Sequence, residues 1–78
     1  MNYKVGDDLY FSSFYGDTDD RAMISKKRLN KKGAKFYKLK KVHKQDMHSP
    51  KPRLTKRSMW HDEEHLNRNW KKIGSMKP

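Results

Sequence analysis

Lysine and arginine recur at almost every other position between Arg21 and Val42, and apolar residues are set between them. Cationic side chains at this density can neutralise a row of phosphate groups, and they repel one another when no anion is present. The stretch therefore predicts a binding surface for a polyanion, with nucleic acid as the first candidate. The cations expected to contact phosphates are Lys26, Lys27, Arg28, Lys31, Lys32, Lys35, Lys38, Lys40 and Lys41.

Phe36 and Tyr37 lie within this basic stretch and are candidate aromatic contacts. An exposed aromatic ring can stack on an unpaired base and contribute about 1–3 kcal/mol. The alternative, which we favour, places both rings in the hydrophobic core. Nothing in the sequence predicts base-specific readout, so the expectation is binding of DNA or RNA with low sequence specificity.

Two histidines, His61 and His65, are spaced four residues apart, so a helix would place both on one face, as metal ligands require. The zincin motif needs Glu directly after the first histidine, and position 62 is Asp. A third ligand would have to come from His43, His48 or a carboxylate elsewhere in the fold. We favour surface histidines near a helix N-terminus, with no metal and no other cofactor.

The segment from Gly16 to Asp20 reads Gly-Asp-Thr-Asp-Asp and concentrates carboxylates. A calcium loop is one interpretation, but the Gly at the sixth position and the Glu at the twelfth position of the EF-hand are missing. We expect a loop whose acids counter the adjacent basic strand.

No catalytic motif is recognisable, and so short a chain with so little apolar content can hardly enclose a pocket. We therefore expect a non-catalytic protein without a small-molecule substrate. The alternative to nucleic acid is an acidic surface of a host protein, bound through charge and anchors such as Tyr15, Trp60 or Arg53. Membrane binding is not expected, because the polar face of the predicted amphipathic helix is mixed in charge.

Composition allows one small domain. Seventy-eight residues give a thin core, and the 12% aromatic content favours folding despite 37% charged residues. Of the net charge of +11, residues 21–60 carry fifteen Lys and Arg against one Asp, whereas residues 1–20 carry one Lys against five Asp. Because cysteine is absent and no apolar run reaches signal-peptide or membrane-span length, a cytoplasmic location is the default.

Strands are the elements predicted to position the basic stretch. Residues 3–15 are rich in aromatic residues and predict a first strand through residues 9–11, after a turn at Gly6 and Asp7. Fold class is therefore expected to be mainly β.

The turn-forming residues 30–33 divide the basic stretch into two predicted strands, 22–29 and 34–42. The alternative is a helix over residues 20–32 that ends at Gly33. We favour the hairpin because the second segment has a strand pattern and needs a partner. The break in alternation at residues 36–37 predicts a bulge or a strong bend there.

Residues 43–53 contain two prolines and predict an exposed extended loop, followed by a short closing strand over residues 54–57. Ser58 is a predicted N-cap and Gly74 a predicted C-cap of a helix. Its apolar stripe would consist of Met59, Leu66, Trp70 and Ile73. The domain is expected to span residues 1–74, with a frayed tail at 75–78.

The lead-in Lys4-Val5-Gly6-Asp7 before an apolar strand resembles the opening strand of small SH3-like barrels, which include KOW and Tudor modules. The layout of strand, acidic turn, basic hairpin, loop, short strand and helix is similar to that of small β-barrel accessory proteins of bacteriophages. This resemblance implies an α+β fold, either an SH3-like barrel or a twisted antiparallel sheet with one C-terminal α-helix. If phage-encoded, the protein would act in the host cytoplasm; the resemblance transfers no site residues.

Overall fold

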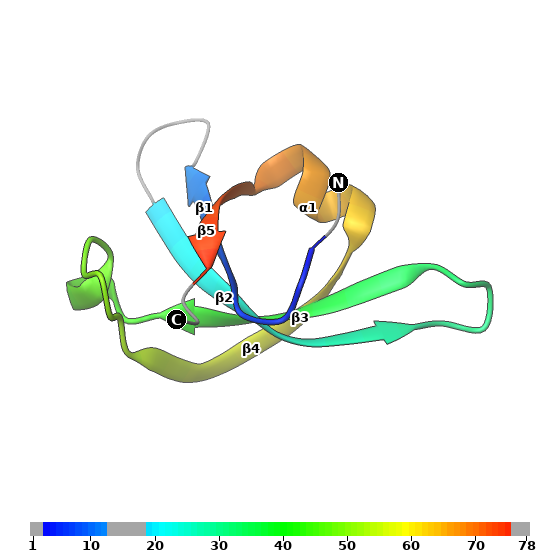
Figure 1. Cartoon of the computed structure of the whole chain (residues 1–78), viewed down its shortest axis with the longest axis horizontal. Helices are drawn as coiled ribbons and strands as arrows, with labels where there is room; N and C mark the ends of the chain where they lie inside the picture. Colours follow the sequence, from blue (N-terminus) through cyan, green and yellow to red (C-terminus); the bar gives the residue numbers. More distant parts are fainter. Residues whose placement is uncertain (1–2, 13–18, 76–78) are drawn as a thin grey trace.

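Five strands form a single antiparallel sheet in the structure, a computed structural model that describes residues 3–12 and 19–75. The strands are β1 (Asp7–Ser12), β2 (Asp19–Leu29), β3 (Lys35–Val42), β4 (Leu54–Asp62) and β5 (Lys71–Ser75). A 3-10 turn, η1 (Lys44–Asp46), lies between β3 and β4, and a seven-residue helix, α1 (Glu63–Asn69), lies between β4 and β5. The strand order is β4-β3-β2-β1-β5, so the last strand pairs with the first (Figure 1). The predicted mainly β domain with one helix is confirmed.

The first strand begins after a turn at Gly6, as predicted. Gly6 has φ +96°, a conformation that favours glycine. Asp7 closes this turn, because its Oδ2 accepts a hydrogen bond from Lys4 N at 2.8 Å. The predicted loop over residues 16–20 is wrong at its end, because Asp19 and Asp20 belong to β2, and residues 16–18 lie outside the described residues.

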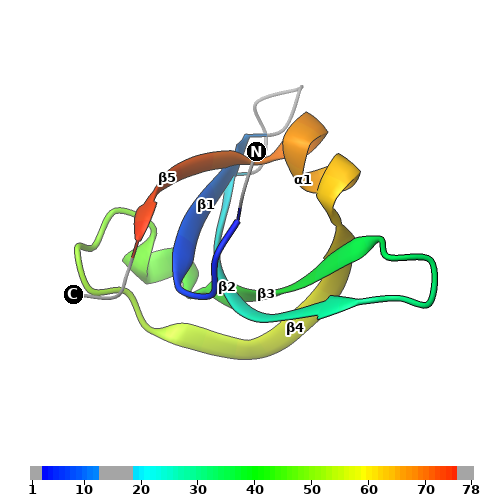
Figure 2. The same cartoon turned by 45° about the vertical axis from the view of Figure 1, so that its right-hand side comes forward.

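The basic stretch folds as the predicted hairpin, not as the alternative helix. Asn30 Oδ1 accepts hydrogen bonds from the backbone N–H groups of Lys32 (2.9 Å) and Ala34 (2.8 Å). Gly33 completes the turn with φ +81°. The tip of this β2–β3 hairpin projects beyond the rest of the sheet in two views (Figures 1 and 2).

A bulge lies in β2 at Ser25. Ile24 pairs with Leu39, but Lys26 pairs with Lys38, so Ser25 is an extra residue on its strand. Its hydroxyl donates a hydrogen bond to the Lys38 carbonyl at 3.2 Å. The sequence predicts a bulge or strong bend at residues 36–37 of β3. The observed bulge lies instead on the partner strand, β2, and nearer the middle of the sheet.

The core is centred on Tyr37, whose ring meets Tyr3 edge-on at a centroid distance of 5.4 Å. Burial, followed by the nearby Glu63 carboxylate, raises the pKa of Tyr37 above its ordinary value of 10.0. The protonated hydroxyl donates to Glu63 Oε2 at 3.3 Å and ties α1 to the sheet. The buried core residues are Tyr3, Leu9, Ala22, Ile24, Tyr37, Leu39 and Leu66, with Trp70 packed against them.

The predicted helix from Ser58 to Gly74 is wrong in its extent. Residues 54–62 continue as β4 along β3, and the helix begins only after Asp62, whose Oδ1 accepts a hydrogen bond from His65 N at 2.8 Å. Residues 71–75 then form β5 along β1, so Gly74 and Ser75, the latter predicted to be in the tail, lie in a strand. Strand pairing at both ends therefore outcompetes the helical propensity of this segment.

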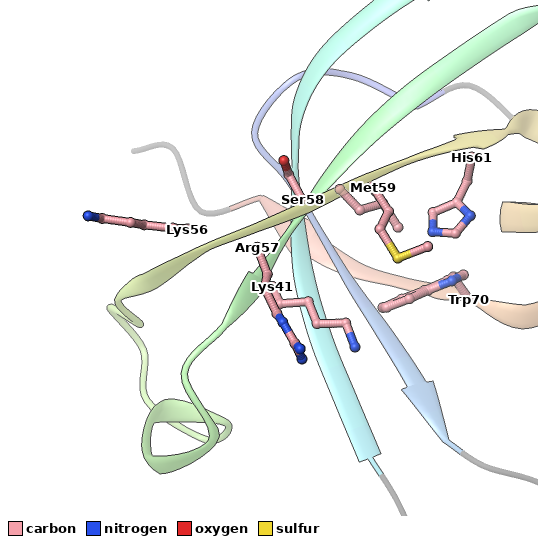
Figure 3. A pocket seen from close by; sticks show the side chains of 8 residues that line it. Lys41, Lys56, Arg57, Ser58, Met59, His61 and Trp70 are labelled. Atoms are coloured by element: carbon pink, nitrogen blue, oxygen red, sulfur yellow. The ribbon is translucent and has the colours of Figure 1, made fainter.

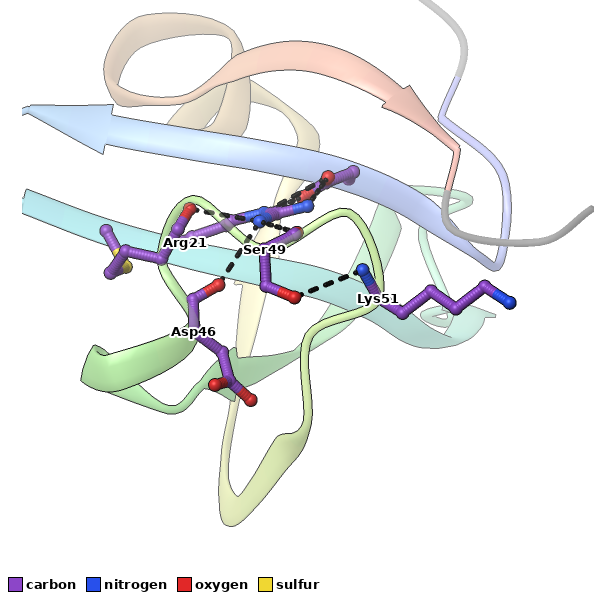
Figure 4. Close-up of polar contacts among 6 residues, drawn as sticks. Arg21, Asp46, Ser49 and Lys51 are labelled. Carbon is purple, nitrogen blue, oxygen red and sulfur yellow. Dashed lines mark hydrogen bonds and ion pairs between the residues drawn. The ribbon is translucent and has the colours of Figure 1, made fainter.

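Loop residues 43–53 connect β3 to β4, as predicted, and one buried guanidinium holds this loop on the sheet (Figure 4). Arg21 is 8% exposed and donates from Nη2 to Asp8 Oδ2 at 2.6 Å. Its Nη1 donates to the carbonyl oxygens of Met47 (3.0 Å) and Ser49 (2.8 Å). Arg21 is therefore a structural residue, although it begins the basic stretch.

We predict that Arg21→Leu lowers the free energy of unfolding by about 3–5 kcal/mol, because it leaves Asp8 buried without a counter-charge. Urea denaturation measures this loss. The matched control is Arg53→Ala, which removes an exposed ion pair with Asp46 and should cost much less. An equal loss in the two variants would contradict the central role of Arg21.

We further predict that Leu66→Ala lowers the free energy of unfolding by about 2–5 kcal/mol, because Leu66 is fully buried on the single face of α1 that meets the core. Ile73→Ala should cost about 0.5 kcal/mol or less, because Ile73 is 54% exposed in β5. In the predicted helix over residues 58–74, Leu66 and Ile73 would share one apolar stripe, and the two losses would be similar. Chemical denaturation of both variants therefore distinguishes that helix from the observed α1 followed by β5.

Candidate nucleic-acid interface

The sheet face opposite the core is basic. Side chains alternate between the two faces of a strand, and paired residues share a face. Lys38 is the partner of both Lys26 and Trp60, and Phe36 is the partner of Arg28. Because Tyr37 and Leu39 point into the core, these residues point away from it. We call this surface the outer basic face, and its members are Lys26, Arg28, Phe36, Lys38, Lys40 and Trp60.

Trp60 lies between the cations of this face. The Arg28 guanidinium carbon lies 4.3 Å from the centroid of the Trp60 ring, and Lys38 Nζ lies 6.0 Å from it. Such contacts are attractive because the electron-rich ring face meets a positive charge. The Arg28 guanidinium therefore lies over the Trp60 ring, next to Lys38 on the same face.

Seven of the nine predicted cations have no ion-pair partner within 4.0 Å among the residues that the structure describes. Like charges directly opposite one another, such as Lys26 and Lys38, are destabilising. No described carboxylate therefore neutralises these seven cations. The seven are Lys26, Lys27, Arg28, Lys31, Lys32, Lys38 and Lys40.

The other predicted cations are placed differently. Lys35 Nζ lies 4.0 Å from Glu63 Oε2, and Lys41 Nζ lies 3.4 Å from Asp20 Oδ2. Lys41 belongs to the inner face of β3, away from the outer basic face. The pairing with Asp20 agrees with the expectation that acids of the 16–20 segment counter a basic strand.

Lys27 and the two turn lysines, Lys31 and Lys32, do not belong to the outer basic face. Lys27 shares a face with Tyr37, and its Nζ lies 5.9 Å from that ring. Lys31 and Lys32 are exposed at the hairpin tip, beyond the last strand pair.

The two predicted aromatic contacts take opposite positions. Tyr37 has no exposed surface and belongs to the core, which is the interpretation that we favoured for it. Phe36 is half-buried on the outer basic face, where it remains accessible. Among the suggested protein anchors, Tyr15 lies outside the described residues and Arg53 binds Asp46.

Trp60 was expected in a helix, where it would not join the hairpin. One signal could have placed it correctly: Leu54 and Thr55 begin a strand, and no glycine or proline interrupts the chain between them and Trp60. Strand pairing across the sheet, rather than local sequence, brings its ring to Arg28.

His61 and His65 lie in β4 and α1, not in one helix. Their rings stack at a centroid distance of 4.3 Å, with an angle of 9° between the planes. In the described part of the chain, no group of three or more His, Cys, Asp or Glu side chains could hold a metal ion. Burial lowers the pKa of His61 from its ordinary 6.5, and repulsion from His65 lowers it further.

The chain has no match among family models, curated proteins or solved structures. Within residues 3–12 and 19–75, no helix is both long enough and apolar enough to span a membrane. The candidate site therefore rests on the geometry of the sheet: a small β-rich domain that presents a basic face around one tryptophan.

We predict that stability falls as the pH is lowered from about 7.5 to about 5.5. The folded state holds His61 neutral at pH values where the unfolded chain already binds a proton, so acidification below 6.5 favours unfolding. Thermal melts across this range measure the effect. His61→Gln should flatten the profile, and a profile that stays equally steep in this variant would contradict the role assigned to His61.

Proposed function

We propose that this protein is a non-catalytic binding protein that engages nucleic acid through phosphate contacts from the β2–β3 hairpin. The observation that carries the proposal is the set of cations on this hairpin that no described carboxylate neutralises. A phosphate backbone would relieve their mutual repulsion and release counterions, which drives association.

The geometry supports contacts to the backbone more than to the base edges. Lys26 and Arg28 on β2, and Lys38 and Lys40 on β3, form two neighbouring rows on one face. Cations in rows can follow a strand of phosphates, whereas base readout requires side chains placed against particular base edges. Phe36 on the same face can stack on an unpaired base without reading its identity.

We also infer that the sheet is a variant of the SH3-like barrel. The sequential antiparallel order of β1 to β4, and the return of β5 to β1 after a short helix, support this inference. The bulge at Ser25 increases the local twist of the hairpin, as curved barrels require. An experimental structure in which β4 and β5 diverge into a flat open sheet would contradict it.

We predict that Lys26→Gln combined with Lys38→Gln weakens binding to single- and double-stranded oligonucleotides, independently of their sequence. Each neutralised contact should reduce the slope of log affinity against log salt by about 0.9 on duplex DNA, so the double variant should lose about 1.8. Fluorescence anisotropy titrations at several salt concentrations measure both quantities.

The matched control neutralises two exposed cations of the 43–53 loop, Lys44→Gln and Lys51→Gln, which changes the net charge equally. If the loop variant lost as much salt dependence as the hairpin variant, binding would depend on net charge alone and the assigned face would be wrong. Copurification of one host protein after nuclease treatment, with no oligonucleotide affinity, would overturn the proposed function.

A further inference from the structure

The far edge of β4 is free. β4 ends the sheet and pairs only with β3 within residues 3–12 and 19–75. Every second residue of an edge strand directs its backbone N–H and C=O groups outward, where they can pair with another extended chain. Natural sheets shield such edges or use them to bind peptides by strand addition.

A groove of about 600 Å³ lies on the inner face of the β3–β4 pair, and residues of β4 form most of its lining. Figure 3 shows Met59 and His61 reaching from β4 toward the indole of Trp70, the residue that connects α1 to β5. Met59 is 59% exposed, although it is a large apolar residue. Trp70 is held in place by Phe11, with ring centroids 5.4 Å apart. Among the described residues, the apolar floor of the groove is formed by Leu39, Met59 and Trp70, and Met59 remains largely exposed.

One end of the groove is cationic. Lys41, Lys56 and Arg57 line it, and neither Lys56 nor Arg57 has an ion-pair partner among the described residues. In Figure 3, Arg57 and Lys41 lie on the same side of β4, whereas Lys56 points away along the edge. A ligand that extends from the apolar floor to this end would meet positive charge next to the free backbone groups.

We propose that the edge of β4 binds an acidic peptide in an extended conformation, with an apolar side chain in the groove and carboxylates against Arg57 and Lys56. The proposal concerns a second site, distinct from the outer basic face and independent of the proposed function. Backbone hydrogen bonds to β4 would supply affinity, and the groove would select the side chain.

Two other occupants fit the observations less well. A second copy of this chain would bring another Lys56 and Arg57 to the same edge, and like charges across a strand pair are destabilising. A nucleic acid could neutralise the cations, but its phosphate backbone offers acceptors and few donors, which would leave the outward carbonyl groups of β4 unpaired. An acidic peptide satisfies the charges, the N–H groups and the C=O groups together.

The test uses an array of peptides of about eight residues, within the usual length of a strand, in which Phe, Leu, Val or Tyr stands two positions from a Glu or Asp. These two side chains share a face, as Met59 and Arg57 do on β4, and a second acid at the neighbouring position faces Lys56. We expect concentration-dependent binding to the full chain, with slowed amide hydrogen exchange at alternate residues of β4. Met59→Glu should weaken binding about tenfold or more, because it places a carboxylate on the groove floor. N-methylation of alternate peptide amides should abolish binding, because it removes the ladder donors.

The hairpin variant Lys26→Gln with Lys38→Gln serves as the matched control and should bind the peptides as the parent chain does. Circular dichroism of Met59→Glu checks that its sheet is intact, and Met59→Ser offers a milder change at the same position. Absence of binding by every peptide in the array would overturn the proposal. So would equal binding of N-methylated peptides, competition by an oligonucleotide at this groove, or dimerisation through β4. If the hairpin variant loses oligonucleotide affinity but still binds the peptides, this result supports the proposed function and leaves the peptide site unaffected.

Discussion

The buried pair between Arg21 and Asp8 is the constraint on which the rest of the structure depends. A guanidinium can be buried only where its donors all find acceptors, because an unpaired buried charge is very costly. Here the Asp8 carboxylate and the carbonyl groups of the β3–β4 loop supply those acceptors. The pair thereby fixes the loop, the loop fixes where β4 begins, and β4 carries both Trp60 and the free edge beside the groove.

This constraint is part of a wider division of charge. The described carboxylates are occupied by structural partners: Arg21 binds Asp8, and Lys72 binds Asp7 at 3.1 Å, which joins β5 to β1. These ion pairs join separate elements of the fold. The remaining ion pairs are Lys35 with Glu63, Lys41 with Asp20, Arg53 with Asp46 and Arg68 with Glu64. Several cations without an ion-pair partner among the described residues, such as Lys26, Arg28 and Lys38, therefore gather on the outer basic face.

Local signals predicted the parts of the fold that local chemistry determines. Asn30 and Gly33 mark the hairpin turn, and the prolines of residues 43–53 mark the loop, because these residues restrict the backbone directly. The extent of α1 was not predictable in this way, since Ser58 and Asp62 are equally good N-caps and only pairing with β3 decides between them. Arg21 looked like its basic neighbours, and its burial depends on Asp8 in another strand. For the candidate site, the sequence predicts a group of cations but not how the fold divides them between the two faces of the sheet, because that division depends on strand register.

The division between faces follows from the single extra residue in β2. Without the bulge at Ser25, pairing from Ile24 and Leu39 onward would place Lys27 and Leu29 on the outer side, and Lys26 and Arg28 beside the core. The bulge reverses this arrangement. Lys26 and Arg28 then point outward, where Arg28 reaches the Trp60 ring, while Lys27 faces the core side with its Nζ 5.9 Å from the Tyr37 ring. The extra residue Ser25, between Ile24 and Lys26, therefore determines which charges form the outer basic face, and a slip in this register would remove the face while leaving the composition unchanged.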